Sequence, residues 1–534
     1  MKQNTFARAV RLIATLALAV AVSGCVTKTI ATDPTKAPAT QGQSPVVLST
    51  TSNTAEVRGF DTIRLVRFSE PGENPLAVVT IDTYELRRVA PGMARDTALF
   101  VGNLPAGKYY ITDLVDARSN LKLNVSRARH DTLGVFAVTA GAPVDLGRLI
   151  VTPLNTKVLH GRSRLVQSNA ELLKRYSPEY ARLFTVPVQG GWTKPPLETD
   201  RVEEYALTRP VGADCMSELD DGRVAAASRL GSVLLRDRGG RWNIVRGPGI
   251  ESLLCVLPVT LPDADLLAVG EFGALLKHVP GATTLTPVDR GNLPLGNLMR
   301  IYGNPNVGWY VAHQDGDRLT FFHSRRLEGG DWQSVGSESV KAAFWGGEKQ
   351  FFMWPTPTGF AYSLYKGPMH FYEYATGAWT KRPLPESRRI VDLFVSPNNV
   401  LSVETIKGGM AKAFGAVHVS RDDGRTWTAV EGPFKVMRSP AVELADGTLL
   451  LYAGEVFGKV QLQASGDGGK TWKARPENGQ GGQMLPLNSG GLLAYDRGYT
   501  GVFSIHSSKD GAQTWTQEYT TFDSKFLEML SGQK

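Results

Sequence analysis

Short apolar runs separated by turn-forming residues fill most of the chain, and this pattern predicts many short strands. Between residues 56 and 155, polar and apolar residues alternate over Thr62–Phe68, and more continuous apolar runs occupy residues 98–101 and 146–151. Turn signals such as Glu70-Pro71-Gly72 separate these runs. About seven short strands in this region predict a small β-sandwich domain over residues 56–155.

Helical signals are concentrated in residues 156–205. Ser168 and Glu171 have the spacing of a capping box, in which the serine hydroxyl caps the first turn and the glutamate reaches back to it. Ser177-Pro178 offers a second N-cap with proline at the first helical position. We therefore expect two short helices over residues 168–184, in a connector that joins two β-domains.

A strand pattern with a period of about 46 residues repeats from residue 206 to residue 534. Its marker is a short segment of the form S-x-D-x-G-x-T-W, matched twice in full and twice in part. The residues that carry the marker are Ser420, Asp422, Gly424, Thr426 and Trp427 in one full copy, Ser465, Asp467, Gly469, Thr471 and Trp472 in the other, Ser508, Asp510, Thr514 and Trp515 in a near-copy, and Asp237, Gly239 and Trp242 in a degenerate copy.

The spacing of the tryptophans predicts the number of repeats. Looser copies end at Trp332 and Trp379, and the interval from Trp242 to Trp332 is two periods, which leaves room for one degenerate copy near residue 288. Four strands fit one period, the size of a propeller blade. We expect six to eight blades, and seven matches the spacing best. Trp192 would mark an eighth partial unit or a closing strand.

The chemistry of the marker suits a tight turn. An Asp carboxylate can accept N–H groups across the turn, Gly supplies a backbone angle that other residues resist, and the Trp ring can pack beneath the turn between strands. The segment resembles the Asp-box of the bacterial neuraminidase repeat family, also seen in sortilin-like and photosystem-assembly-factor-like propellers. That resemblance implies that each copy joins the third and fourth strands of a blade. The segment from Leu104 to Tyr109 resembles a hairpin of transthyretin-like and carboxypeptidase-regulatory-like modules, which implies a fold and not a function.

The first 25 residues have the organisation of an export leader. Basic residues precede an apolar run from Leu12 to Val22, which is too short to span a bilayer. The end of the run, Val22-Ser23-Gly24-Cys25, resembles the bacterial lipobox, which implies removal of a signal peptide over residues 1–24 and acylation of Cys25. The alternative is an ordinary secretory signal that contains a cysteine.

The lipobox resemblance also predicts location. Val26 follows the cysteine, and an Asp there would favour the inner membrane, so we expect a lipid anchor in the outer membrane, facing either the periplasm or the outside. Residues 25–55 are rich in Thr, Ala, Pro and Ser and predict a flexible tether. Cys215 and Cys255 precede equivalent strands of neighbouring repeats, so in an exported chain they could form a disulfide or remain two buried thiols.

Composition and charge exclude few classes of function. The net charge is +8, or about +5 without the leader, and the chain has no long basic run, so we expect no nucleic-acid partner. Serine-nucleophile, zinc-protease and phosphate-loop motifs are missing from the sequence. We therefore assign no catalytic residue, no metal ligand and no cofactor. A sialidase would need an arginine triad, and the nearest match to its first segment, Thr208-Arg209-Pro210, lacks the apolar spacer.

These patterns together predict an all-β protein in which a small β-sandwich precedes a propeller. We expect a non-enzymatic lipoprotein of the bacterial envelope, bound to membrane lipid through Cys25, whose propeller is a scaffold for envelope proteins. The alternative is a propeller that binds or cleaves glycans, as sialidases do. Five aromatic residues would form a platform for sugar or peptide if they are exposed, and core if they are not: Trp354, Tyr362, Tyr365, Tyr372 and Tyr374.

Overall fold

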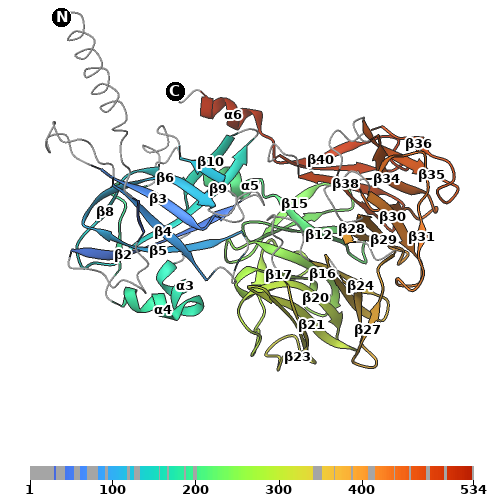
Figure 1. Cartoon of the computed structure of the whole chain (residues 1–534), viewed down its shortest axis with the longest axis horizontal. Helices are drawn as coiled ribbons and strands as arrows, with labels where there is room; N and C mark the ends of the chain where they lie inside the picture. The colour runs from blue at the N-terminus through green and yellow to red at the C-terminus, as the bar shows by residue number, and fades with distance from the viewer. Residues whose placement is uncertain are drawn as a thin grey trace, which may run out of the picture.

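The computed structural model confirms an all-β architecture with two bodies, an N-terminal sheet and a seven-bladed propeller (Figure 1). The structure describes residues 29–31, 42–52, 60–68, 82–90, 94, 96–116, 121–125, 133–154, 157–164, 168–185, 188–195, 201–340, 351–365, 367–385, 389–406, 415–437, 439–455, 459–476, 482–497 and 502–531. The leader and Cys25 lie outside these residues, so the lipid attachment stays a prediction.

Hydrogen bonds join the N-terminal strands into one network of 11 strands, whose main path runs β10-β9-β2-β5-β4-β3-β6-β7. The strands are β1 (Thr29–Ala31), β2 (Gln43–Ser52), β3 (Thr62–Phe68), β4 (Thr83–Val89), β5 (Ala98–Pro105), β6 (Gly107–Asp116), β7 (Leu121–Asn124), β8 (Phe136–Val138), β9 (Val144–Leu154), β10 (Lys157–Arg162) and β11 (Gln189–Gly190). Their inward side chains enclose one apolar core that includes Leu48, Leu86, Phe100 and Phe136.

Strand β2 lies inside the segment predicted to be a flexible tether, and that prediction is wrong for residues 43–52. The strand pairs with β5 on one side and β9 on the other, so it is central to the sheet. Val46 and Leu48 are buried in the core, while Ser44 Oγ donates to the Thr139 carbonyl oxygen at 2.6 Å. Hydroxyl-rich sequence resembles a linker, yet hydroxyl groups can be buried when they find hydrogen-bond partners.

The two predicted helices are present in the connector. Helix α3 (Asn169–Tyr176) is capped by Ser168, whose Oγ accepts from the Glu171 amide, and α4 (Pro178–Ala181) begins with proline and runs into a 3-10 turn, η2 (Arg182–Phe184). The Glu171 carboxylate pairs with Lys174 at 2.5 Å, whereas in a capping box it would accept from the Ser168 amide.

Helix α5 (Val202–Thr208) was not predicted, and it takes in residues 206–208, which were assigned to the propeller. Near the other end of the chain, α6 (Ser524–Ser531) packs on α5, where the rings of Phe526 and Tyr205 stack with centroids 4.6 Å apart. Trp192 belongs to the N-terminal domain, because it bridges to Phe136 and its Nε1 donates to the Leu146 carbonyl at 2.7 Å. It therefore marks no eighth blade.

The propeller has seven antiparallel sheets, each built from consecutive strands with the first strand innermost. The blades are β12 (Gly212–Glu218), β13 (Val224–Ser228), β14 (Ser232–Arg236) and β15 (Trp242–Arg246); β16 (Leu253–Leu261), β17 (Ala264–Gly270), β18 (Leu275–His278) and β19 (Leu285–Pro287); β20 (Asn297–Asn304), β21 (Gly308–Asp315), β22 (Arg318–Ser324) and β23 (Gln333–Ser339); β24 (Phe351–Thr356), β25 (Gly359–Leu364), β26 (Met369–Glu373) and β27 (Ala378–Arg382); β28 (Arg389–Val395), β29 (Leu401–Ile406), β30 (Gly415–Ser420) and β31 (Thr428–Ala429); β32 (Val436–Met437), β33 (Val442–Glu443), β34 (Leu449–Gly454), β35 (Val460–Ser465) and β36 (Lys473–Ala474); and β37 (Gln483–Pro486), β38 (Leu492–Arg497), β39 (Phe503–Ser508) and β40 (Thr516–Thr520).

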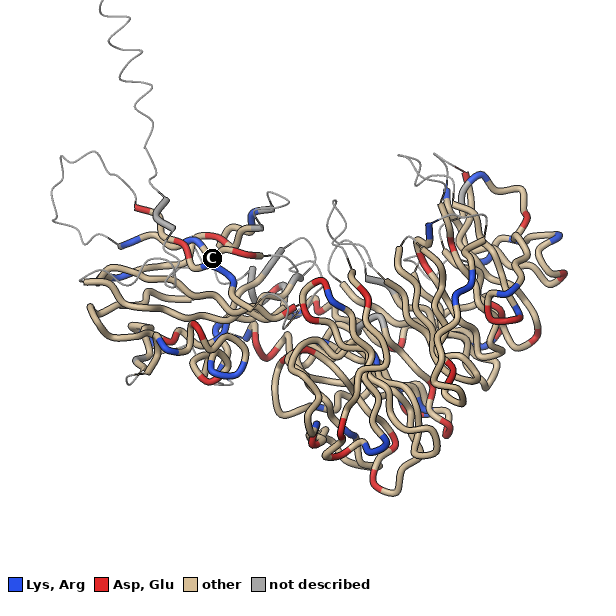
Figure 2. Tube along the Cα trace, turned by 60° about the horizontal axis from the view of Figure 1, so that its bottom comes forward, with Lys and Arg blue, Asp and Glu red and all other residues tan. Residues whose placement is uncertain are grey.

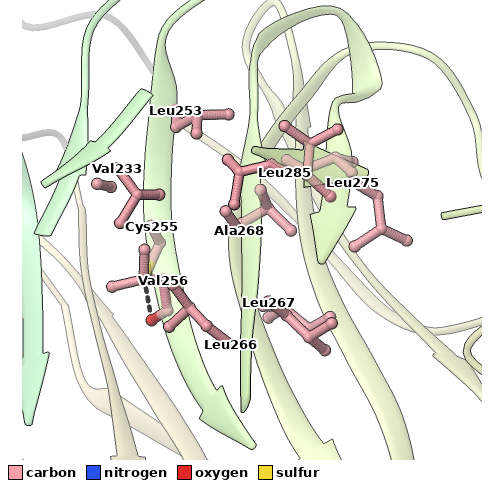
Figure 3. Packing of buried hydrophobic residues seen from close by; sticks show 14 of the residues in the cluster. Val233, Leu253, Cys255, Val256, Leu266, Leu267, Ala268, Leu275 and Leu285 are labelled. Carbon is pink, nitrogen blue, oxygen red and sulfur yellow. Dashed lines mark hydrogen bonds between the residues drawn. The ribbon is translucent and has the colours of Figure 1, made fainter. Parts of the chain in front are cut away.

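The blade count of seven confirms the count that the tryptophan spacing favoured. The fourth strand of blade 2, β19, ends at Pro287, where a degenerate copy near residue 288 was expected. Apolar side chains fill the space between blades: Figure 3 shows Val233 of blade 1 beside Cys255 and Val256 of blade 2. This packing removes large apolar surfaces from water and holds neighbouring sheets together.

The innermost strands of blades 1 and 2 are joined by a disulfide between Cys215 and Cys255, with the Cα atoms 4.9 Å apart. We expect the double variant Cys215→Ser/Cys255→Ser to lose about 2–4 kcal/mol of unfolding free energy, because the open chain gains conformational entropy when unfolded. Guanidinium unfolding checks this prediction. Reductant should shift the wild-type transition toward that of the variant and leave the variant unchanged; an equal effect on both proteins would contradict it.

Two equivalent turns of blades 1 and 2 hold the N-terminal domain. Both turns follow the second strand of the blade: Arg229 begins one and Glu271 begins the other. Arg229 Nε lies 3.0 Å from Asp96 Oδ2, and both side chains are 1% exposed. The Glu271 carboxylate accepts hydrogen bonds from the Asp96 and Thr97 amides. Opposite charges at the same place in two repeats therefore hold one segment of the N-terminal domain.

The ring closes without a strand shared between its two ends, because all four strands of blade 7 come from one stretch of chain. The seam between blades 7 and 1 is instead fastened by side chains. Glu518 on β40 receives two hydrogen bonds from Arg236, both at 2.7 Å, and one from Trp242 Nε1 at 3.1 Å. Tyr519 OH donates to the Pro210 carbonyl at 2.8 Å beside them.

Candidate functional site

The repeat marker forms a tight turn between the third and fourth strands of blade 5. Ser420 Oγ donates to Asp422 Oδ1 at 2.8 Å and accepts from the Gly424 amide at 2.7 Å. The Asp422 carboxylate accepts from the Arg425 and Thr426 amides at 3.0 and 2.8 Å, and from Thr426 Oγ1 at 2.7 Å. The carboxylate thus holds the turn closed.

The turns of blades 6 and 7 repeat this pattern around Asp467 and Asp510, with each donor–acceptor distance within 0.3 Å of its counterpart in blade 5. In the near-copy, Ala512 occupies the place of the marker glycine with a φ of 66°, a conformation that alanine resists. Asp237 of the degenerate copy accepts from the Arg241 amide at 2.9 Å and from the Gly239 amide, and it contacts the Arg241 side chain.

Acid should weaken these turns. Hydrogen bonds from the following threonine hydroxyl and amide hold the pKa values of Asp422, Asp467 and Asp510 well below the ordinary value. A carboxyl whose pKa is lowered by folding stabilises the fold above its unfolded pKa, and this stability is lost as the pH falls toward the folded pKa. We expect unfolding free energy to drop below about pH 4, and to drop less steeply in the triple Asp→Asn variant.

Thermal unfolding over pH 2–7 measures this difference between slopes. The control is a triple Asp→Asn variant at exposed positions outside the marker turns: Asp315, Asp317 and Asp446. Equal slopes for the two triple variants would show that the turn carboxylates do not carry the pH dependence.

Three of the tryptophans hydrogen-bond their blade to the blade before it. The Nε1 atoms of Trp379, Trp472 and Trp515 donate to the carbonyls of Val335, Glu431 and Pro476, at 2.8, 2.9 and 3.2 Å. Trp332 and Trp427 have buried Nε1 atoms with no acceptor among the described residues. The marker therefore stabilises the outer strands of the blades, and it lies away from the propeller axis.

Polar side chains from three non-adjacent blades approach one another at the axis. Arg300 lies on the innermost strand of blade 3, Asp392 on the innermost strand of blade 5, and Tyr495 on the second strand of blade 7. Burial raises the pKa of Tyr495, and the charges of Asp392 and Arg300 act on that pKa in opposite directions. Since blades 3, 5 and 7 are not neighbours, these interactions must cross the axial space. Tyr495 OH donates to Gln483 Oε1 at 2.9 Å, which adds an amide group to the axial site.

Arg300 is the cation of the axial site. Its guanidinium donates to the Leu254 carbonyl at 3.4 Å, and among the described residues no carboxylate lies within ion-pair distance of it. Burial lowers the pKa of Arg300, yet a guanidinium stays protonated in proteins. A cation in such a position attracts a carboxylate or phosphate group, which it can bind with two parallel hydrogen bonds.

Tyr302, two residues along the same strand, adds a buried hydroxyl to the site. The two residues influence each other electrostatically, and burial raises the pKa of Tyr302. The Tyr302 hydroxyl is buried without a hydrogen-bond partner among the described residues, and its ring stacks on Phe360 with centroids 5.0 Å apart. Buried hydroxyl groups in proteins are nearly always paired, so this donor is a candidate for contact with a ligand.

Sequence analysis did not find the axial site. Its residues belong to no motif, and they are spread over blades 3, 5 and 7. The signal that was available is the placement of Arg300 inside the apolar stretch Leu298-Met299-Arg300-Ile301, where a cation has no structural reason to lie.

Of the two alternatives for the five aromatic residues, platform or core, the structure supports core for most of them. Trp354, Tyr362 and Tyr372 are at most 5% exposed. Tyr362 and Tyr372 pack between blades 3 and 4, and Trp354 packs between blades 4 and 5. Tyr374 also packs against the core of these blades. The alternative that these residues form core therefore describes them.

Arg209, the nearest match to a sialidase arginine, binds Asp523 at 2.9 Å and the Thr520 carbonyl at 3.2 Å. It ties the end of β40 to α5, and it does not take part in the axial site. Of the arginines that the structure describes, Arg300 is the one whose charge interacts across the axis with Tyr495.

Other classes of site find no support in the described part of the chain. It contains no group of three or more His, Cys, Asp or Glu side chains placed to hold a metal ion. None of its helices has the length and apolar character needed to cross a membrane. Basic and acidic residues are interspersed over both bodies in Figure 2.

No family model matches the sequence, and no curated protein matches it. Solved structures resemble part of the chain at low identity. A streptogramin B lyase aligns with a TM-score of 0.37 and 12% identity over 53% of this chain and 89% of the lyase. YCF48 bound to D1 peptide aligns with a TM-score of 0.37 and 17% identity over 50% of this chain and 83% of YCF48. The fold assignment rests on the strand pairing described above.

Proposed function

We propose that this chain is a non-enzymatic, lipid-anchored protein of the bacterial envelope whose propeller binds an acidic group of a partner protein at the axial site. The observation that carries the proposal is Arg300, a partly buried cation on the innermost strand of blade 3 without a carboxylate partner among the described residues. A partly buried cation is screened less by water than one on the open surface, so a partner that supplies the opposite charge would be bound more strongly here.

The surrounding donors favour a carboxylate over a neutral group. Tyr302 brings a buried hydroxyl without an acceptor, and the Gln483 amide lies beside Tyr495. The ring is rigidly built, so the donors are held in place before the ligand arrives, which reduces the entropy cost of binding. A scaffold role follows, since seven blades present a fixed binding site on a body that is itself fixed to the N-terminal domain.

Fluorescence anisotropy with peptide pools tests the axial site. Each pool would be made twice, with free and with amidated C-termini, so that the carboxylate is the only difference. Binding of free-acid peptides should fall about 10–100-fold in Arg300→Met, the loss expected for a hydrogen bond to a charged group. The control is Arg318→Met, an exposed arginine of blade 3. Equal binding by both variants would contradict the proposal.

A second variant distinguishes an effect on ligand binding from an effect on folding. Tyr302→Phe removes a hydroxyl that has no partner among the described residues, so it should leave stability unchanged or raise it by up to about 1 kcal/mol. The same variant should weaken binding of the free-acid peptides. An array of acidic glycans tests the alternative of glycan binding. Glycans that bind the wild type and not Arg300→Met would show that the ligand is a sugar and not a protein.

The anchor is tested separately. Wild-type protein made in an exporting bacterial host should float with membranes, and Cys25→Ser should not. The acyl chains are detected by mass spectrometry of the N-terminal peptide. A wild-type chain without acyl groups would contradict the envelope assignment and leave the axial site standing.

A further inference from the structure

The N-terminal domain has two ends, and the propeller occupies one of them. At that end Asp96 and Thr97, which precede β5, are held by Arg229 and Glu271 of the propeller. Thr51, near the end of β2, donates to the Ile250 carbonyl at 3.4 Å. In Figure 1 the antiparallel strands β2 and β5 extend between the far side of the domain and the propeller, and β2 runs toward the propeller.

The opposite end is a tip made of turns. It comprises Gly42, Arg67, residues 105–108 and residues 140–141. Gln43 pairs with Pro105, the Ala106 amide donates to the Gly42 carbonyl at 3.1 Å, and Arg67 Nη2 donates to the Ala106 carbonyl at 3.0 Å. Arg67 and Lys108 are exposed cations of the tip.

Strand β1 brings the start of the mature chain to this tip. Thr29 pairs with Thr83 at the beginning of β4, in a parallel register that runs to Ala31 and Glu85. Arg87 of β4 pairs with Val101 of β5, so the beginning of β4 is level with Pro105. Chain length then sets a limit: Cys25 precedes Thr29 by four residues, which span at most about 14 Å.

We propose that the tip rests on the bilayer surface and that the N-terminal domain is a rigid spacer that holds the propeller at a fixed height above it. The proposal depends on the lipid anchor at Cys25. The 10 residues of β2 span about 33 Å from tip to propeller. Anionic headgroups would attract Arg67 and Lys108, and the buried contacts of Asp96 and Glu271 prevent the propeller from swinging freely.

A flexible tether over residues 25–55 would have had a different consequence. It would leave the folded body free to sample many heights above the membrane, because a flexible chain of that length spreads its ends widely. The pairing of β1 with β4 leaves residues 26–28 as the spacer between Cys25 and the sheet. The height of the propeller is thus set by the sheet and not by a linker.

Energy transfer from the protein to acceptor-labelled headgroups tests the proposal. The acylated full chain would be placed in vesicles of phosphatidylethanolamine and phosphatidylglycerol. One donor dye goes on Ala140→Cys at the tip, and another on Lys473→Cys in blade 6, both exposed positions. With Cys25 acylated and Cys215 bonded to Cys255, each new thiol is the one available for labelling.

Transfer from Ala140→Cys should be several-fold greater than from Lys473→Cys. Ile30→Pro should reduce the transfer at the tip, because proline removes an N–H group from β1 and opposes its pairing. Thr35→Pro is the control for a proline outside the strand, and it should leave transfer unchanged. Equal transfer from the two dyes, or no effect of Ile30→Pro, would overturn the spacer proposal.

Flotation of the same samples distinguishes the two proposals. A chain that floats with the vesicles but gives equal transfer from both dyes keeps its anchor and lacks the spacer geometry. A chain that carries no acyl group and stays in solution contradicts the anchor, and the spacer proposal fails with it.

Discussion

Arg229→Met is expected to lower the free energy of unfolding by about 3–5 kcal/mol, since it leaves the Asp96 carboxylate buried without its cation. Both side chains of the pair are 1% exposed, so water cannot replace the lost partner. The variant should also loosen the N-terminal domain from the propeller, because Arg229 is one of the two charged groups that hold the Asp96–Thr97 segment. Guanidinium unfolding measures the first effect, and small-angle X-ray scattering measures the second as a larger radius of gyration.

A matched control is available at Arg241, which pairs with Asp237 across 3.3 Å but is 81% exposed. Arg241→Met should cost less than about 1 kcal/mol, as exposed ion pairs do. The double variant Arg229→Met/Asp96→Asn should recover part of the loss, because it no longer buries an unpaired charge. If Arg229→Met were no more harmful than Arg241→Met, the buried pair would not be what joins the two domains.

The repeat could be predicted because its signal is local. Asp422 closes its turn with groups that lie within four residues of it, so the hydrogen bonds are implied by the sequence itself. The period then located even the degenerate blade 2, whose fourth strand has no tryptophan. Local chemistry and spacing were sufficient for the fold class, the blade count and the position of the turns.

Contacts between distant segments could not be predicted in the same way. The acceptor of Trp472 is a backbone carbonyl 41 residues earlier, and any residue can supply a carbonyl. Arg229 and Glu271 occupy equivalent places in two repeats, yet nothing in the repeat shows that both would face Asp96. The axial site has the same character, because its members are brought together only when the ring closes.

The prediction of a flexible tether at strand β2 was wrong for a different reason. Composition separates linkers from strands by their apolar content, and Ser and Thr occupy five of the 10 residues of β2. The hydroxyl groups are buried because the strand lies between two others, and Thr51 Oγ1 even approaches Thr97 Oγ1 to 3.2 Å. A central strand can therefore carry polar side chains wherever the neighbouring layer offers partners.

Closure of the ring depends on the seam between blades 7 and 1, and its side chains differ from those at the other seams. Trp379, Trp472 and Trp515 donate to backbone carbonyls, whereas Trp242 donates to the Glu518 carboxylate. The same carboxylate is paired with Arg236, and each side chain of that pair is 9% exposed. One acidic residue thus satisfies two donors from the first blade at the place where the two ends of the ring meet.

Glu518→Ala should therefore lower the free energy of unfolding by about 3–5 kcal/mol, because Arg236 is left buried and unpaired. Burial raises the pKa of Glu518, but hydrogen bonds from Arg236 outweigh it and the pKa lies below the ordinary value, so the stabilisation should be present at neutral pH and lost in acid. Hydrogen exchange should show the amides of β37–β40 opening first. The control is Glu328→Ala, whose partner is Lys277 and whose side chain is 56% exposed. Equal losses in Glu518→Ala and Glu328→Ala would mean that apolar packing alone closes the ring.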